Sequence, residues 1–134
     1  MSDKKLQSQF ADVNDIRLHY VSAGQGELIM FVHGFPEFWG EWENQLIEFG
    51  KDFQAVALDM RGYNLSAKPG DVEAYHAKHL VEDLRALAEY LGHQKFILVA
   101  HDWGGAVAWS TAMRYPEWVE KLIIINSPHP AIFA

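Results

Sequence analysis

The carboxylate that ends an apolar run is the residue of this chain best placed to do chemistry. Residues 96–105 read Phe-Ile-Leu-Val-Ala-His-Asp-Trp-Gly-Gly, so a strand-like stretch stops at Asp102 and two glycines open a helix-like stretch. An abrupt strand-to-helix turn holds its side chain above the sheet edge, beside the first unpaired N–H groups of the helix. Residues 100–104 match the Gly-x-Ser-x-Gly nucleophile pattern, with Asp102 replacing serine and Ala100 replacing the first glycine.

An aspartate at this turn implies a different reaction from a serine. With a reference pKa of about 3.9, Asp102 is already an anion near neutral pH and needs no base to attack. Attack on a carbonyl would give an anhydride, whereas attack on a saturated carbon with a leaving group gives an alkyl ester that water can cleave. This favours epoxides or alkyl halides as substrates. The alternative is that Asp102 only caps the following helix, since Asp is a preferred N-cap residue.

Three further segments with polar residues each follow an apolar run. They are residues 33–36 (His-Gly-Phe-Pro), 59–63 (Asp-Met-Arg-Gly-Tyr) and 126–130 (Asn-Ser-Pro-His-Pro). Arg61 and Tyr63 are either substrate contacts or structural residues, and we expect Arg61 to brace its loop by pairing with a nearby acid. His33 and His129 belong to these loops, and His101 directly precedes Asp102. Each of these histidines can be either a hydrogen-bonded structural residue or part of a site.

Apolar runs alternate with helical stripes along the chain. The patterns predict strands at residues 16–21, 28–32, 53–58, 96–100 and 122–125, and helices at residues 38–49, 80–91 and 104–114. The first strand alternates apolar and polar residues, which predicts half-burial. Continuous apolar strands between helices predict an α/β fold with a mostly parallel sheet and helices on both faces. In such sheets, sites lie beyond the carboxyl ends of the strands, so the polar groups share one rim.

Length and composition narrow the class of protein. The 134 residues predict a single domain over 1–134, and 49% hydrophobic with 22% charged residues is an ordinary globular composition. A net charge of −7 argues against nucleic acid as a partner. The sequence has no cysteine, no signal-peptide pattern and no apolar run long enough to span a bilayer. We expect a cytoplasmic protein with no membrane partner.

No cofactor is predicted. The histidines lack the paired i, i+4 spacing of a helical zinc motif, so no metal is expected. Residues 24–26 (Gly-Gln-Gly) precede a strand instead of opening a helix, and the third glycine of the dinucleotide fingerprint is missing.

The three segments 33–36, 59–63 and 126–130, together with residues 101–103 (His-Asp-Trp), resemble the epoxide hydrolase branch of the α/β-hydrolase family, and the likeness runs from about Phe10 to the end of the chain. The resemblance implies that Asp102 is the nucleophile and that the backbone N–H groups of Phe35 and Trp103 form the oxyanion hole. It also implies that Pro36 shapes the loop, through a cis bond to the preceding residue. His33, Pro36 and His101 are candidate substrate-binding residues.

The resemblance favours an epoxide as the small-molecule substrate. Related haloalkane dehalogenases tend to place asparagine where this chain has Phe35, and fluoroacetate dehalogenases usually follow their nucleophile with arginine where this chain has Trp103. A haloalkane or fluoroacetate dehalogenase of the same fold, acting on an alkyl halide, remains the alternative.

The resemblance also implies that the chain is the N-terminal, nucleophile-bearing half of an α/β-hydrolase fold, because it stops at Ala134. The family's base histidine, supporting acid and lid domain lie further downstream. We therefore expect an isolated chain to be incomplete or inactive in turnover. Strand 122–125 would be left exposed, which predicts a homo-oligomer, or pairing with a complementing C-terminal half. The remaining alternative is a non-catalytic truncated or engineered half-domain that self-associates.

Overall fold

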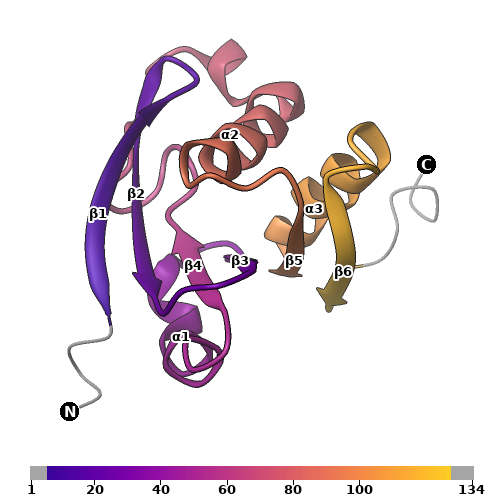
Figure 1. The fold of residues 1–134 in the computed structure, drawn as a ribbon. Helices are drawn as coiled ribbons and strands as arrows, with labels where there is room; N and C mark the ends of the chain where they lie inside the picture. The colour runs from indigo at the N-terminus through magenta and orange to yellow at the C-terminus, as the bar shows by residue number, and fades with distance from the viewer. Residues whose placement is uncertain (1–5, 128–134) are drawn as a thin grey trace.

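A six-stranded sheet with helices on both faces forms the framework of the computed structural model, which describes residues 6–127 (Figure 1). The strands are β1 (Gln7–Val13), β2 (Ile16–Ala23), β3 (Leu28–Val32), β4 (Gln54–Leu58), β5 (Phe96–His101) and β6 (Val119–Ile125). The helices are α1 (Glu43–Phe49), α2 (Ala77–Tyr90) and α3 (Trp103–Arg114), and two short 3-10 helices are η2 (Trp39–Trp42) and η3 (Val72–Tyr75).

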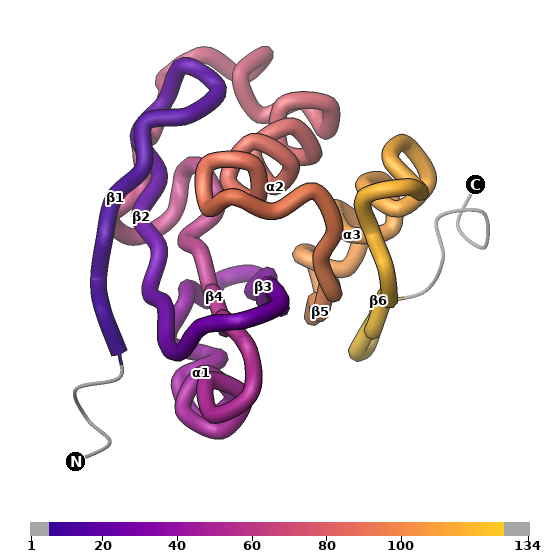
Figure 2. Tube along the Cα trace, in the orientation of Figure 1, coloured from indigo at the N-terminus to yellow at the C-terminus, as the bar shows by residue number. Residues whose placement is uncertain are grey.

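The sheet is mostly parallel, as the sequence predicted. Its strand order is β1-β2-β4-β3-β5-β6, so that β3 lies between β4 and β5 (Figure 2). Strands β4, β3, β5 and β6 run parallel, whereas β2 is antiparallel to β4 and β1 is antiparallel to β2. Each parallel connection carries a helix, which is the arrangement that buries both faces of such a sheet.

Each face of the sheet has its own hydrophobic core. On one face, α2 and α3 cover a cluster that includes Leu84, Leu98 and Val107. On the other face, α1 and η2 contribute Leu46 and Trp42 to a smaller cluster. Strands β3, β4 and β5 lie between the two cores, which is why they read as continuous apolar runs in the sequence.

Three local predictions need correction. Strand β1 was not predicted, because its first four residues are exposed and only Ala11 is buried, which leaves little apolar pattern to detect. Strand β2 is buried over its last six residues and is not half-buried, since helices cover both faces there. The helix predicted at 38–49 begins with the 3-10 helix η2, in which the Glu43 N–H bonds the Gly40 carbonyl, before α1 starts.

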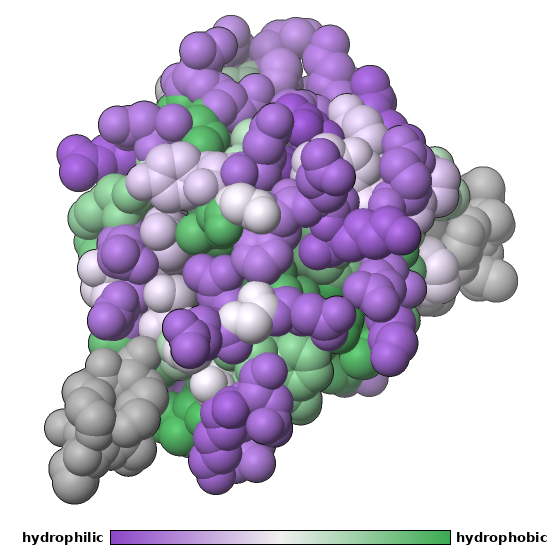
Figure 3. Space-filling model, viewed as in Figure 1, coloured by the Kyte–Doolittle hydropathy of each residue, from purple (hydrophilic) through white to green (hydrophobic). Residues whose placement is uncertain are grey.

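Strand β6 lies at the end of the sheet. It pairs with β5 and has no second neighbour among residues 6–127, and its Ile123 and Ile125 side chains are 47% and 42% exposed. Hydrophobic surface appears near the ends of β5 and β6 in Figure 3, between largely hydrophilic residues. Self-association through this strand, or pairing with a complementing half, stays a prediction.

The helices are short, and α2, the longest that the structure describes, has 14 residues. Within residues 6–127, none is long and apolar enough to cross a membrane.

The central strands should dominate stability. Leu98 is fully buried in β5, so we expect Leu98→Ala to lower the free energy of unfolding by about 2–5 kcal/mol. The matched change Ile123→Ala, at a half-exposed position of the same sheet, should cost about 1 kcal/mol or less. Urea unfolding followed by circular dichroism measures both. Equal losses for the two variants would show that the core does not lie where the structure places it.

Candidate active site

The carboxyl ends of the parallel strands meet at one edge of the sheet. Val32 at the end of β3 is in register with Leu58 of β4 and with Ala100 of β5, and Ala100 is in register with Ile124 of β6. The loops that follow these strands therefore share one rim, as predicted, over the residues that the structure describes. His129 lies outside those residues.

Asp102 sits at the turn between β5 and α3 in a strained backbone conformation. Its φ of 56° and ψ of −122° lie in a region that non-glycine residues rarely occupy, and such strain persists only where the surroundings enforce it. Its backbone is fixed on both sides, because its N–H donates to the Ile125 carbonyl at 3.1 Å and its carbonyl accepts from the Gly105 N–H at 2.8 Å.

The carboxylate of Asp102 does not cap α3 in the usual way. A capping side chain accepts a hydrogen bond from the N–H of the second or third helical residue, and Asp102 makes no such bond. The side chain is instead exposed above the sheet edge. This geometry differs from that of a simple helix cap, which was the alternative role of Asp102 in the sequence analysis.

Two backbone donors hold the Asp102 carboxylate. The N–H groups of Trp103 and of Phe35 hydrogen-bond it and lower its pKa, and the nearby His101 adds a smaller effect in the same direction. The Phe35 N–H lies 3.3 Å from Oδ2. The structure thus brings together Asp102, Phe35 and Trp103, to which the family resemblance assigns the nucleophile and the oxyanion hole, and these roles stay predictions.

Two glycines permit this close approach of β3, β5 and α3. A Cβ atom on Gly34 would lie 2.7 Å from the Asp102 Cβ, and one on Gly104 would lie 2.3 Å from the His33 carbonyl oxygen. Real Cβ atoms do not approach other heavy atoms this closely. Gly104, the last residue of the motif at residues 100–104, is therefore required so that α3 can pack against the end of β3.

His33 orients the peptide group that supplies the Phe35 donor. Its Nε2 accepts a hydrogen bond from the Met60 N–H at 3.0 Å, so Nδ1 carries the proton and donates to the Gly34 carbonyl at 3.0 Å. That carbonyl and the Phe35 N–H belong to one peptide group. Burial lowers the pKa of His33, which favours the neutral ring that this bonding requires. The predicted substrate contact of His33 conflicts with this geometry, because the ring is fully buried and both nitrogens are bonded.

Glu41 is a site-lining residue that the sequence analysis missed. Its Oε1 accepts from the Gly34 N–H at 3.0 Å, and its Oε2 pairs with Nδ1 of His101. Glu41 thereby ties the loop after β3 to the loop after β5. The predicted substrate-binding residues Pro36 and His101 lie at the same rim, Pro36 exposed and His101 partly exposed, and their contact with substrate stays a prediction.

A pocket of about 350 Å³ opens beside Phe35 and Trp103. Its lining residues come from the loops after β3 and β4 and from η3, α2 and α3, and they are Phe35, Arg61, Gly62, Tyr63, Tyr75, Leu80 and Trp103. Burial, and then the charge of Asp102, raise the pKa of Tyr63, so its hydroxyl keeps its proton and can donate. The pocket combines an apolar wall with a phenol donor next to a carboxylate.

Arg61 braces the rim, as the sequence predicted. Its guanidinium binds both carboxylate oxygens of the buried Asp83 in α2, at 2.7 Å each, and donates to the Ala74 carbonyl at 2.7 Å. The bond between Phe35 and Pro36 is cis, as the family resemblance implied.

The two backbone donors should lower the pKa measured for the carboxyl group of Asp102. We expect its carboxyl group to ionise below the ordinary aspartate value of about 3.9, because the N–H groups of Trp103 and Phe35 stabilise the anion. The group then stays charged as the pH falls and gains its proton only below that value. Carbon-13 NMR of the side-chain carboxyl measures this, with Asp102→Asn assigning the signal. Titration at or above about 3.9 would contradict the geometry.

The close packing at Gly104 should be measurable as stability. Gly104→Ala forces a methyl group against the His33 and Val32 carbonyls, and we expect a loss of about 1–3 kcal/mol. Gly70→Ala is the matched control, since a Cβ there meets nothing within 4 Å, and it should change stability by about 0.5 kcal/mol or less. Thermal unfolding of both variants makes the comparison. An unchanged Gly104→Ala protein would mean that α3 lies further from β3.

Comparison with known proteins agrees with this arrangement. Epoxide hydrolase 1 of Caenorhabditis elegans is 49% identical over 128 residues, an alignment that covers 94% of this chain and 32% of that protein. A crystal structure of an epoxide hydrolase from Bacillus megaterium, in complex with an inhibitor, has a TM-score of 0.89 and 54% identity, covering 90% of this chain and 43% of that one.

An epoxide hydrolase from Vigna radiata gives a TM-score of 0.91 at 35% identity, covering 93% of this chain and 41% of that one. The chain thus spans about a third of the curated relative's length and less than half of either solved structure. A family profile described as the alpha/beta hydrolase fold matches residues 27–134. With its mostly parallel sheet and its strand-to-helix turn, the chain belongs to the alpha/beta hydrolase fold family.

Proposed function

We propose that this chain carries the nucleophilic half-reaction of an epoxide hydrolase, with Asp102 as the nucleophile. The observation that carries the proposal is an exposed carboxylate, held by the backbone N–H groups of Phe35 and Trp103. The names of the relatives support epoxides as the substrate class. The rim pocket supplies an apolar wall for the substrate beside this carboxylate.

In the first step, a carboxylate oxygen of Asp102 attacks a ring carbon of the epoxide. The ring C–O bond breaks, an alkyl ester forms on Asp102, and the released alkoxide takes up a proton. Tyr63, protonated in the rim pocket, is a hydroxyl donor on this side of the nucleophile. The anionic form of Asp102 is available without a base, because its pKa is lowered.

In the second step, water adds to the ester carbonyl and negative charge develops on the carbonyl oxygen. The N–H groups of Phe35 and Trp103 would stabilise that charge, and one such donor is typically worth about 100- to 1000-fold in rate. A base must deprotonate the water. His33 does not fit that role, since its two ring nitrogens are bonded to Met60 and Gly34. We therefore assign covalent capture of the epoxide, and not complete turnover, to the residues described here.

An alkyl halide is the second candidate substrate. The exposed indole of Trp103 beside Asp102 offers one N–H that can bind a departing halide. The side chain of Phe35 offers no second donor, which favours the epoxide. The same nucleophile would serve both reactions, so the two substrates can be compared on one protein.

Covalent capture can be measured directly. After incubation with styrene oxide, we expect intact mass spectrometry to show the addition of one epoxide and peptide mapping to place it on Asp102. Asp102→Asn should abolish the adduct, because an amide is a far weaker nucleophile. Asp52→Asn, which removes another exposed carboxylate, is the matched control and should be labelled like the unaltered protein.

A parallel incubation with 1-bromobutane distinguishes the two substrate classes. Faster labelling of Asp102 by the bromide than by the epoxide would favour the dehalogenase alternative. Labelling that is spread over several exposed carboxylates, with no preference for Asp102, would contradict both assignments.

A further inference from the structure

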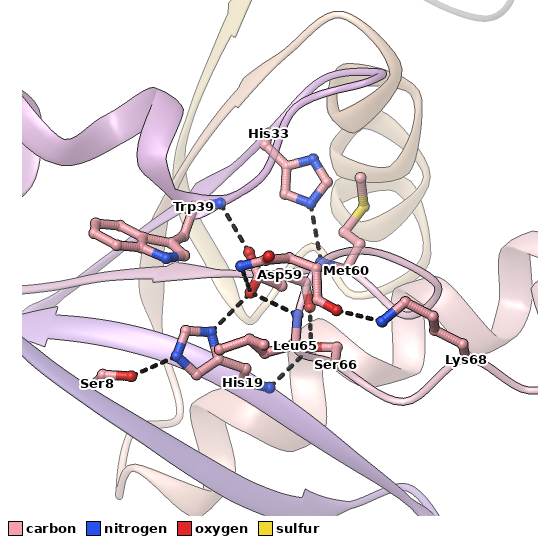
Figure 4. Close-up of polar contacts among 10 residues, drawn as sticks. Ser8, His19, His33, Trp39, Asp59, Met60, Leu65, Ser66 and Lys68 are labelled. Atoms are coloured by element: carbon pink, nitrogen blue, oxygen red, sulfur yellow. Dashed lines mark hydrogen bonds and ion pairs between the residues drawn. The ribbon is translucent and has the colours of Figure 1, made fainter.

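A second chain of hydrogen bonds joins a serine on β1, a histidine on β2 and the aspartate that follows β4 (Figure 4). The Ser8 Oγ on β1 lies 2.6 Å from Nε2 of His19 on β2. The Nδ1 atom of the same ring lies 2.7 Å from Oδ2 of Asp59, which follows β4. These distances join a hydroxyl, a base and an orienting acid in the order that activates a serine.

The contacts of Asp59 fix which nitrogen of His19 carries the proton. Oδ1 accepts from the Trp39 N–H at 2.8 Å, and Oδ2 accepts from the Asn64 side-chain amide at 2.9 Å. Asp59 is therefore surrounded by donors and serves as an acceptor toward Nδ1–H of His19. The lone pair of Nε2 is left facing the Ser8 hydroxyl, which is the tautomer that a general base requires.

The His19 ring is buried away from solvent, whereas Ser8 is exposed. His19 is 1% exposed and Asp59 is fully buried, whereas Ser8 is exposed on the edge strand β1. Phe10, directly opposite His19 in the ladder, lies with its ring centroid 5.1 Å from the imidazole and covers it. A molecule in solution can therefore reach the Ser8 oxygen, while the base beneath it stays shielded.

We propose that Ser8 is a nucleophile, activated by His19 and Asp59, that accepts the acyl group of activated aryl esters. Nothing in the role of Asp102 requires this chemistry, so the inference goes beyond the proposed function. The two sites meet at Asp59, which binds the Trp39 N–H, and at Met60, whose N–H donates to His33.

The bonds that form and break in the acyl transfer determine which class of ester can react. The Ser8 Oγ attacks the acyl carbon, its proton passes to Nε2 of His19, and the aryl oxide leaves as the ester bond breaks. The product is an acyl ester on Ser8, and the departing aryl oxide takes the proton from Nε2 of the imidazolium. Among residues 6–127, the bonds around Ser8 supply a base but no N–H donor for a developing oxyanion. A good leaving group must replace that donor, so aryl esters react and amides do not.

The test uses p-nitrophenyl acetate with the whole chain. We expect a burst of about one equivalent of p-nitrophenolate, with the acetyl group placed on Ser8 by peptide mapping. Ser8→Ala should abolish the burst, and since Ser8 is exposed, this variant should fold. Ser110→Ala removes a partly buried serine on α3 and should keep the burst.

Two further variants separate this site from the rim. Asp102→Asn should keep the burst, which distinguishes the reaction from that of the proposed epoxide nucleophile. His19→Gln, checked by circular dichroism for folding, should slow acetylation of Ser8 by about 100- to 10,000-fold. The proposal is overturned if Ser8 is acetylated no faster than Ser110, or if Ser8→Ala keeps the burst. Loss of the burst in Asp102→Asn but not in Ser8→Ala would assign the ester chemistry to the rim.

Discussion

The peptide group between Gly34 and Phe35 is the element on which the rest of the rim depends. Its N–H donates to the Asp102 carboxylate, and its carbonyl accepts from the ring of His33 and, at 2.8 Å, from the Glu37 N–H. The planar peptide group is thus held by hydrogen bonds at both its N–H and its carbonyl oxygen. A donor fixed in this way needs little reorganisation when charge develops on the carboxyl group, and that preorganisation is the main source of such stabilisation.

The remaining contacts of the rim keep this plane in place. Met60 fixes His33, Glu41 holds the Gly34 N–H, and Gly104 lets α3 approach the end of β3. These contacts come from loops that follow different strands, so the parallel register of the sheet is what brings them together. The strain at Asp102 is then a consequence of packing: its backbone is bonded to both Ile125 and Gly105, and it has no freedom to relax.

The sequence predicted the parts of this structure that have local signals. Strand β3 is predicted without error because it is buried on both faces, and Asp102 is found because a strand, a turn and two glycines are contiguous. Contacts between distant segments have no such signal. The pairs Glu41 with His101, and His19 with Asp59, lie on separate elements, and each residue alone is an ordinary charged or aromatic residue. Strand β1 was not predicted, because most of its side chains are exposed and form no apolar pattern.

The central claim is that Asp102 attacks while its carboxyl group remains bound to the two backbone donors. A crystal structure of the chain after reaction with styrene oxide tests this most directly. We expect continuous density from the Asp102 carboxyl group to a substrate carbon, with the ester carbonyl oxygen within hydrogen-bond distance of the Phe35 and Trp103 N–H groups. An adduct on another residue, or an ester carbonyl turned away from both donors, would contradict it.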